Sequence, residues 1–254
     1  AGSVAEGRLT TESGVPVSTS DRSAQSTLYY TPFNGSRISL YDGTRWKLYE
    51  FTEISLALSG LTSGVNYDVF LYSNTGTLTL ELTAWSSDTA RATAITRTDG
   101  VYLRSGSTTR RYLGTIRTTS TTTTEDSRTK RFVWNAYNTV TRSLYVTDST
   151  DSWTYATNSW RSTNGSTSNR VEFVNGESHV NVSARTMLLA QSSSGASNYI
   201  SSGVGLDSTT VNSAQMRGAG TLNGVVNQTW GFYAGYPGLG YHYLQWIENS
   251  NTTS

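Results

Sequence analysis

Apolar and polar residues alternate along most of the chain, as is typical of β-strands with one buried face. Ile54, Leu56 and Leu58 alternate with small residues, and leucine occupies every second position of the segment 78–82. The sequence has no long stretch with apolar residues at the i, i+3, i+4 and i+7 spacing of an amphipathic helix. Threonine, valine, tyrosine and tryptophan are abundant, and they suit a pleated, half-buried surface. We therefore expect an all-β fold with little or no helix.

Turn signals separate the predicted strands. Asn-Gly and Asp-Gly dipeptides tolerate the positive φ angles of tight hairpins. They occur at Asn34-Gly35, Asp42-Gly43, Asp99-Gly100, Asn164-Gly165, Asn175-Gly176 and Asn223-Gly224. Two more hairpins are predicted at Asn74-Thr75-Gly76 and Ser105-Gly106. Strands separated by short turns at this density predict antiparallel β-sandwich or jelly-roll-like domains.

One local motif predicts a specific hydrogen bond. The segment LSGLTSGVNYDVFLY places Leu61, Gly64 and Tyr67 in an L-x-x-G-x-x-Y frame. This frame resembles the tyrosine corner of fibronectin type III and related sandwiches, in which a Tyr at the start of a strand bonds its hydroxyl to the preceding loop. We expect the Tyr67 ring to fill the edge of the core while its hydroxyl pairs with the backbone.

Changes in pattern predict the domain organisation. Residues 1–28 lack a core pattern and are interpreted as an N-terminal arm. Residues 29–117 are predicted to form a β-sandwich domain. The threonine run at 118–130 is flanked by charges and has nothing to bury, which indicates a linker or an edge strand. Residues 131–254 are predicted to form a second β domain, in which the stretch 192–227 has only weak strand signals.

Composition narrows the classes of partner. Charged residues make up 15% of the 254 residues, and the formal net charge is +1. No strong overall field therefore draws the chain to nucleic acid or to a membrane surface. No apolar run approaches the ~20 residues of a membrane span. The chain has no cysteine, which excludes disulfides and thiolate metal sites.

Candidate catalytic residues are few. His179 and His242 each lie in a strand pattern, and no Gly-x-Ser-x-Gly segment marks a nucleophile. Structural roles are favoured for both, although a triad assembled in space stays open. Glu125 and Asp126 are adjacent and point to opposite faces of a strand, which does not suit a glycosidase pair. We expect no enzymatic activity, no catalytic residue and no cofactor.

Two charged patterns leave alternatives open. Asp148 and Asp151 could share a hard cation, but a solvated turn is the preferred interpretation, and no metal site is predicted. Arginines concentrate between Arg91 and Arg131. They indicate either a patch for an anionic glycan or nucleic acid, or a charged sheet face with ion pairs. The near-zero net charge favours the sheet face.

Aromatic residues indicate packing and contact surfaces. Segments such as YDVFLY carry large residues on both faces, which indicates strands covered on both sides by another domain or subunit. The predicted assembly or packing residues are Tyr29, Tyr30, Phe33, Trp46, Phe70 and Tyr72. Two other aromatic clusters could stack on sugars or cap the core, and capping is favoured. Their candidate glycan or receptor contacts are Trp153, Tyr155, Trp160, Tyr233, Tyr236 and Tyr241.

Several long segments resemble a family of structural proteins of tailed bacteriophages and prophages, of the tail-fibre or minor virion type. The segments are TLYYTPFNGSRISLYDGTRWKLYEF, LSGLTSGVNYDVFLY, GVYLRSGSTTRRYLGTIRTT, TTEDSRTKRFVWN and GYPGLGYHYLQWIE. The resemblance covers residues 7 to 248, nearly the whole chain, and carries over no catalytic position.

This resemblance implies a virion component that forms a homo-oligomer, most simply a trimer, and binds other virion proteins of the tail, baseplate or capsid. Residues 1–28 would dock the particle, and the aromatic loops would contact host surface glycan. Two alternatives remain: a capsid decoration or cement protein that stabilises the head, and a glycan-degrading tailspike.

Overall fold

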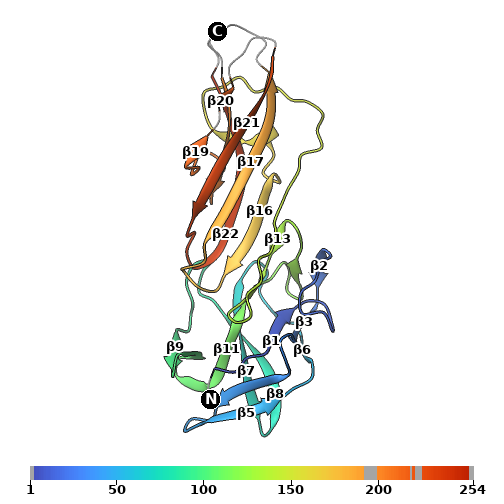
Figure 1. Ribbon diagram of the computed structural model, residues 1–254, viewed down its shortest axis with the longest axis vertical. Coiled ribbons are helices and arrows are strands. Elements are labelled where there is room, and N and C mark those ends of the chain that lie inside the picture. Colours follow the sequence, from blue (N-terminus) through green and yellow to red (C-terminus); the bar gives the residue numbers. More distant parts are fainter. Residues whose placement is uncertain (1–2, 192–198, 218, 221–224, 252–254) are drawn as a thin grey trace. The chain divides into compact units, whose positions relative to one another are not determined.

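The computed structural model describes residues 3–191, 199–217, 219–220 and 225–251. The chain is all-β with antiparallel strands, as predicted, and it divides into two compact units (Figure 1). The first unit is Ala1–Leu144, Phe173–Ser178 and Gly238–Tyr241, and the second is Tyr145–Glu172, His179–Pro237 and His242–Ser254. In the described residues, helical structure is confined to a 3-10 turn, η1 (Thr163–Gly165). The predicted turn at Asn223-Gly224 lies outside these residues.

The first unit contains several antiparallel sheets. One joins β1 (Gly7–Thr10), β3 (Thr27–Pro32) and β6 (Ile54–Ala57) in that order. A larger sheet is built from β7 (Asn66–Asn74), β8 (Thr77–Ala84), β9 (Ile95–Thr98), β10 (Val101–Arg104), β11 (Ser107–Arg117) and β14 (Val133–Asn135). Its order is β8–β7–β11–β10–β9, and β14 also pairs with β11. The remaining groups are the hairpin β4 (Arg37–Tyr41)–β5 (Trp46–Glu50) and the strands β2 (Arg22–Gln25), β12 (Thr124–Asp126) and β13 (Lys130–Arg131).

The alternating leucines and isoleucines line the core of the first unit. Leu80 is buried, and Ile54, Leu56, Leu78 and Leu82 pack against the same cluster. Fully buried apolar side chains come from several strands: Leu9, Leu28, Ile38, Leu71, Leu113 and Ile116. The period-two pattern thus predicted the buried face correctly.

Four of the predicted turns are confirmed as hairpins. They join β4 to β5, β7 to β8, β9 to β10 and β10 to β11. Asp99 and Gly100 have φ angles of 50° and 81°, which matches the two-residue turn that their sequence favours. The dipeptides at 34–35 and 175–176 instead link strands of different sheets, and Asn164-Gly165 lies in η1.

The domain boundaries differ from those predicted. The supposed arm contains β1, whose Leu9 is buried in the core, so residues 7–10 belong to the first unit. The threonine run is no linker: Thr118 and Thr124 are buried, and their hydroxyls donate to Thr62 O and Arg117 O at 2.7 and 2.6 Å. Buried hydroxyls can replace an apolar pattern when each finds a carbonyl. The first continuous segment of the first unit extends to Leu144, beyond the predicted domain end at residue 117.

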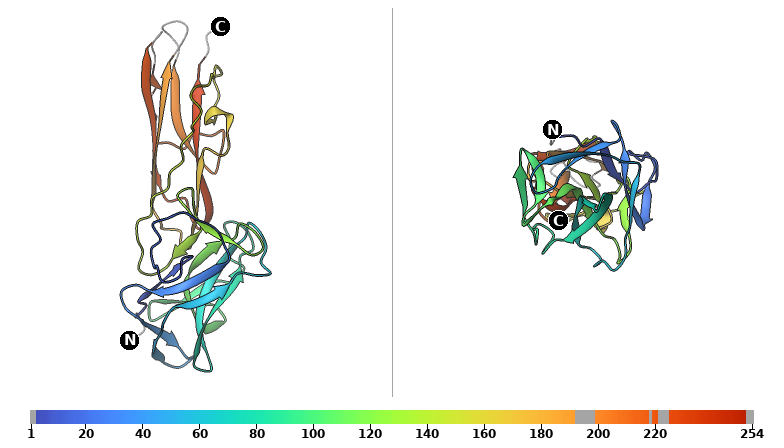
Figure 2. Two further views of the ribbon diagram at one scale, coloured as in Figure 1. Left: turned by 90° about the vertical axis from the view of Figure 1, so that its right-hand side faces the viewer. Right: turned by 90° about the horizontal axis from the view of Figure 1, so that it is seen from below.

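The strands of the second unit form two sheets. Their bounds are β15 (Arg161–Ser162), β16 (Arg170–Asn175), β17 (Val182–Gln191), β18 (Ile200–Leu206), β19 (Met216–Arg217), β20 (Ala219–Gly220), β21 (Val226–Gly235) and β22 (Gly240–Ser250). One sheet contains β16–β22–β18–β20, with β15 also paired to β22, and the other has the order β17–β21–β19. Figures 1 and 2 show β17 and β21 side by side along their lengths.

Small residues bring the two sheets of this unit close together. A methyl group on Gly231 of β21 would lie 2.9 Å from Gly203 Cα of β18. Beside this contact, Ser202 N–H donates to Thr229 Oγ1 at 3.2 Å, and Ser202 Oγ donates to Thr186 Oγ1 at 2.9 Å. The interior here is therefore made of backbone and hydroxyl groups rather than branched apolar side chains.

Candidate functional site

Among the described residues of the second unit, several exposed large apolar side chains gather on the outer face of β17 and β21. In their antiparallel register Met187 lies directly opposite Trp230, and Leu189 follows Met187 on the same face. Val226 is diagonal to Leu189 across the strand pair, close enough for large side chains to touch. We call these four residues, Met187, Leu189, Val226 and Trp230, the apolar face.

The apolar face is exposed to an unusual degree. The exposed fractions are 56% for Met187, 66% for Leu189, 59% for Val226 and 44% for Trp230. Together these residues present on the order of a few hundred Å² of apolar surface, interrupted by the amide of Gln228 opposite Leu189, and patches of this size on soluble proteins are often functional. The opposite side of the same strands packs inward through Leu188, Thr229 and Tyr233.

The apolar face is also nearly uncharged. Arg185 is the only charged residue in the sequences of β17 and β21, and its guanidinium lies 5.7 Å from the Phe232 ring centroid. The strand was predicted, but its exposed face was missed. The signal is the run MLLA at 187–190, which is apolar on both faces of the strand where one face would be enough for a core.

The predicted glycan contacts Trp153, Tyr155 and Trp160 are engaged within the second unit. Trp153 Nε1 donates to Glu248 Oε2 at 2.8 Å, and the Tyr155 hydroxyl donates to Ser159 O at 2.8 Å. Each of the three aromatic side chains is half-buried. A methyl group on Gly203 would lie 2.9 Å from the Trp160 ring, so this ring covers the strand backbone. Their polar groups therefore fix this part of the fold.

Glu248 is the centre of this arrangement. Its side chain is 2% exposed and accepts hydrogen bonds from Trp153 Nε1, Arg161 Nε and Asn164 N–H. The Arg161 guanidinium in turn lies 3.8 Å from the centroid of the Tyr155 ring. A buried carboxylate requires such partners, because burial without them is costly.

The other three predicted contacts lie in different environments. Tyr233 is buried in the second unit, whereas Tyr236 is 66% exposed. Tyr241 belongs to the first unit, where Arg117 lies 3.8 Å from its ring centroid and Phe132 packs edge-on at 6.0 Å. Of these three residues, Tyr236 therefore has the side chain most open to a partner.

The residues predicted for assembly are mostly used inside the first unit. Tyr30 is buried, stacks on Phe51 at 4.9 Å and accepts a hydrogen bond from Gly7 N–H, and its burial raises the pKa of the hydroxyl. Tyr29 is half-buried on β3. Trp46 is half-buried, and its Nε1 donates to Asp99 Oδ2 at 2.8 Å. Phe33 is 38% exposed and lies under the Arg8 guanidinium.

Phe70 shows that the second face of β7 is covered without another subunit at this position. Phe70 is completely buried in the single chain, and its ring centroid lies 5.8 Å from that of Tyr112. Tyr112 continues the stack to Trp134 at 6.3 Å, which forms a second aromatic layer behind the sheet. Tyr72 is half-buried, with the Arg110 guanidinium 4.2 Å from its ring centroid.

The tyrosine corner has the predicted geometry. The Tyr67 ring is buried, and its hydroxyl accepts a hydrogen bond from Thr62 N–H at 2.8 Å. Leu61 packs against the core of the first unit, and Gly64 has a φ angle of 71°, which favours glycine.

The candidate catalytic and cation-binding groups have structural partners. His242 is buried, and its Nδ1 lies 2.7 Å from Asp207 Oδ2, while Asp207 Oδ1 accepts from Tyr243 N–H. His179 is exposed. Among the described residues, no group of three or more acidic or histidine side chains is placed to hold a metal ion.

The carboxylate oxygens of Asp148 accept hydrogen bonds from three neighbouring residues. Asn169 Nδ2 donates at 2.6 Å, Thr150 N–H at 2.9 Å and Asn164 Nδ2 at 3.1 Å, and these bonds hold the pKa of Asp148 well below its usual range. Asp151 is exposed. The lone pairs of Asp148 therefore organise a loop, as in the solvated-turn interpretation.

Ion pairs neutralise most of the arginine-rich segment. Arg91 pairs with the buried Asp68 at 2.7 Å, and Arg117 pairs with Asp88 at 2.7 Å. Arg104 and Arg110 both pair with Glu81. Glu125 pairs with Lys130, and Asp126 with both Arg131 and Arg142. These contacts support the interpretation of a charged, ion-paired surface.

Comparison with known proteins gives no match: no protein-family model, curated protein or solved structure matches the chain. In the described part of the chain, no helix has the length and apolar character needed to cross a membrane.

Proposed function

We propose that the protein is a structural component of a tailed-phage virion, of the tail-fibre type, that attaches to the particle and contacts the host surface. The observation that carries the proposal is the apolar face of β17 and β21. Apolar surface of this extent is unfavourable in water, and it is typical of subunits that function while covered by another protein. The sequence resemblance to tailed-phage structural proteins supports the same class, and the proposal gives the chain no catalytic role.

A second copy of the chain is the partner that fits the apolar face best. Identical faces repel when they carry charge, but here Arg185 is the only charged residue of the two strands. Met and Trp are enriched at the cores of protein interfaces. The face is smaller than the about 800 Å² per partner of a standard interface, so it would form the centre of a larger contact. We therefore propose a homo-oligomer, with a trimer as the simplest arrangement.

The location of the protein on the phage that encodes it tests this function. Antibodies raised against the purified protein would be used for immunogold electron microscopy of purified particles. We expect label on the tail. Label on the head would replace the tail-fibre proposal with a capsid decoration protein, and unlabelled particles in a lysate that contains the protein would contradict both.

A separate assay addresses the tailspike alternative. The purified protein would be incubated with host surface polysaccharide, and the release of reducing ends would be measured over time. We expect no release above that of a heat-denatured control. Sustained release would contradict the non-enzymatic proposal.

A further inference from the structure

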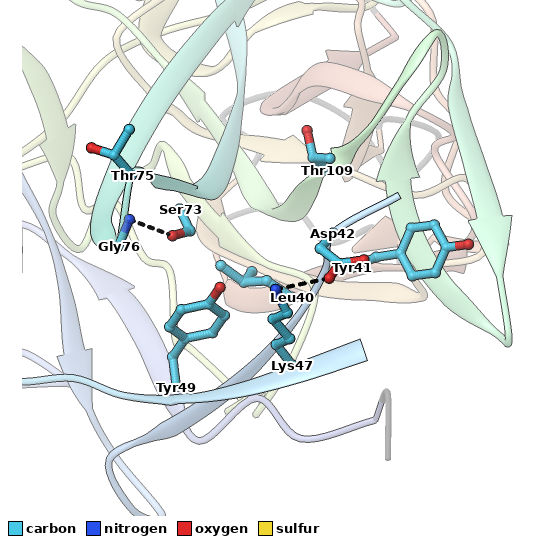
Figure 3. A pocket seen from close by; sticks show the side chains of 9 residues that line it. All are labelled: Leu40, Tyr41, Asp42, Lys47, Tyr49, Ser73, Thr75, Gly76 and Thr109. Carbon is cyan, nitrogen blue, oxygen red and sulfur yellow. Dashed lines mark hydrogen bonds and ion pairs between the residues drawn. The ribbon is translucent and has the colours of Figure 1, made fainter. Parts of the chain in front are cut away.

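A cleft on the first unit is lined by an aromatic ring, hydroxyl groups and an ion pair (Figure 3). Its volume is about 450 Å³, within the range of small-molecule binding sites. The walls come from the hairpin β4–β5, from the turn between β7 and β8, and from β11. None of the residues predicted as glycan contacts lines this cleft.

The register of the β4–β5 hairpin arranges the cleft side chains. Lys47 and Tyr49 are two positions apart on β5, so they project to the same side of the strand, as Figure 3 shows. Leu40 pairs with Lys47 in the register and is buried beneath the cleft. Leu48, between Lys47 and Tyr49, is on the opposite face and is 56% exposed.

The charged side chains that line the cleft are Asp42 and Lys47, which form an ion pair. Asp42 Oδ1 accepts hydrogen bonds from the N–H groups of Arg45 and Thr44 at 2.9 Å, and its Oδ2 lies 2.9 Å from Lys47 Nζ. These contacts hold the pKa of Asp42 well below its usual range, so the carboxylate is ionised. Arg45, which does not line the cleft, lies 3.8 Å from the same Asp42 oxygen and is largely exposed, so Asp42 shares its charge between two cations.

Hydrogen-bonding groups of Lys47, Ser73 and Thr109 also line the cleft. An ammonium group has three N–H donors, and Asp42 takes one from Lys47. Ser73 Oγ accepts from Gly76 N–H at 3.2 Å, and Thr109 Oγ1 accepts from Arg110 Nη1 at 2.9 Å. Both hydroxyls keep their own proton for donation.

We propose that this cleft binds an acidic sugar residue. The apolar face of the sugar ring packs on Tyr49, its carboxylate pairs with Lys47, and its hydroxyls bond with Ser73 and Thr109. This combination of an aromatic plane, hydroxyl partners and an ammonium group whose carboxylate partner is shared with an exposed second cation matches a polar ring with one negative charge. The inference rests on the proposed function only for the source of the sugar, a host surface glycan.

Glucuronic acid and glucose are matched probes because they differ only at C6, where glucuronic acid has a carboxylate and glucose has a hydroxymethyl group. Binding of each to the full chain would be measured by saturation-transfer NMR and titration. We expect saturation of glucuronic acid and at least about tenfold weaker binding of glucose, since one charge-assisted hydrogen bond is lost. Equal binding of the two sugars, or no binding of either, would overturn the proposal.

Two variants and one control locate the site. Lys47→Met keeps the aliphatic stem and removes the charge, and we expect about tenfold weaker binding of glucuronic acid. Tyr49→Ala removes the ring and should abolish the signal, with circular dichroism to verify folding. Leu48→Ala lies between them on the opposite face and should bind as the wild type does. Wild-type affinity in Lys47→Met would overturn the assignment.

The sugar site and the proposed virion function fail separately. If antibodies against the protein label the tail but the protein binds neither sugar, the sugar site alone is contradicted. A protein that binds glucuronic acid through Lys47 but labels no particle would contradict the virion function and leave the cleft assignment standing.

Discussion

The tyrosine corner shows how a single hydroxyl holds a loop in place. The Tyr67 hydroxyl accepts from Thr62 N–H at 2.8 Å while the ring is buried. In Tyr67→Phe the ring remains and the N–H loses its partner. We expect the free energy of unfolding to fall by about 1 kcal/mol, measured by urea denaturation.

Tyr72→Phe is the matched control for this change. The Tyr72 ring lies against the Arg110 guanidinium, and this contact survives the loss of the hydroxyl. We expect a change below about 0.5 kcal/mol. An equal loss in both variants would show that the corner hydrogen bond contributes nothing specific.

Asp148 makes a pH-dependent contribution to stability. Its pKa is lowered from the usual 3.8, first by the hydrogen bond from Asn169 and then by Thr150 and Asn164. Because the folded pKa lies below the unfolded value, the ionised carboxylate stabilises the native state above about pH 4. This stabilisation is lost as the pH falls through the folded pKa. We expect Asn169→Ala to raise the pKa of Asp148 toward 3.8 in a carboxyl-carbon NMR titration, and an unchanged pKa would contradict this assignment.

At the scale of elements, local patterns were predictable and distant partners were not. The hairpin at Asp99-Gly100 depends on two adjacent residues that accept positive φ, so sequence alone identifies it. Strand β18 was weak in sequence because both of its faces are buried around small residues such as Ser202 and Gly203, where close approach of neighbouring groups replaces apolar burial.

The partners of the predicted functional aromatics were not predictable for a related reason. The partner of Trp153 is Glu248, which lies 95 residues away along the chain. Phe70 is buried in the single chain beside Tyr112 of the neighbouring strand, and an alternating pattern cannot distinguish this burial from coverage by another subunit. Neither the apolar face nor the cleft was predicted, because each depends on which strands become neighbours.

The apolar face makes a prediction about oligomeric state. We expect the wild-type chain to be oligomeric at micromolar concentration and Leu189→Glu to be monomeric, since burial of an unpaired carboxylate opposes association by several kcal/mol. Light scattering coupled to size-exclusion chromatography measures the mass. Trp230→Glu, on the neighbouring strand, should have the same effect.

Leu48→Glu controls for a general effect of surface charge. Leu48 is 56% exposed, like Met187, but it lies on β5 of the first unit. We expect this variant to keep the wild-type mass. A monomeric wild type, or dissociation by all three substitutions alike, would contradict the assembly role of β17 and β21.

For the whole molecule, the two proposed activities reside in different units. The apolar face belongs to the second unit, and the sugar-binding cleft belongs to the first. Each unit has its own buried residues, so substitutions of exposed residues in one need not disturb the other. We infer that assembly and sugar binding can be removed separately, which makes the contribution of each to host attachment measurable.

Competition for host adsorption tests the whole molecule. If the chain contacts the host, excess purified protein should occupy receptors and slow adsorption of the phage that encodes it. We expect Lys47→Met to require about tenfold more protein for the same inhibition, matching its weaker sugar binding, while Leu48→Ala inhibits as the wild type does. Free phage counted over time gives the adsorption rate. If wild-type protein leaves the rate unchanged while still binding glucuronic acid, the host-contact role is wrong, because the cleft then recognises a sugar that the phage does not use for attachment.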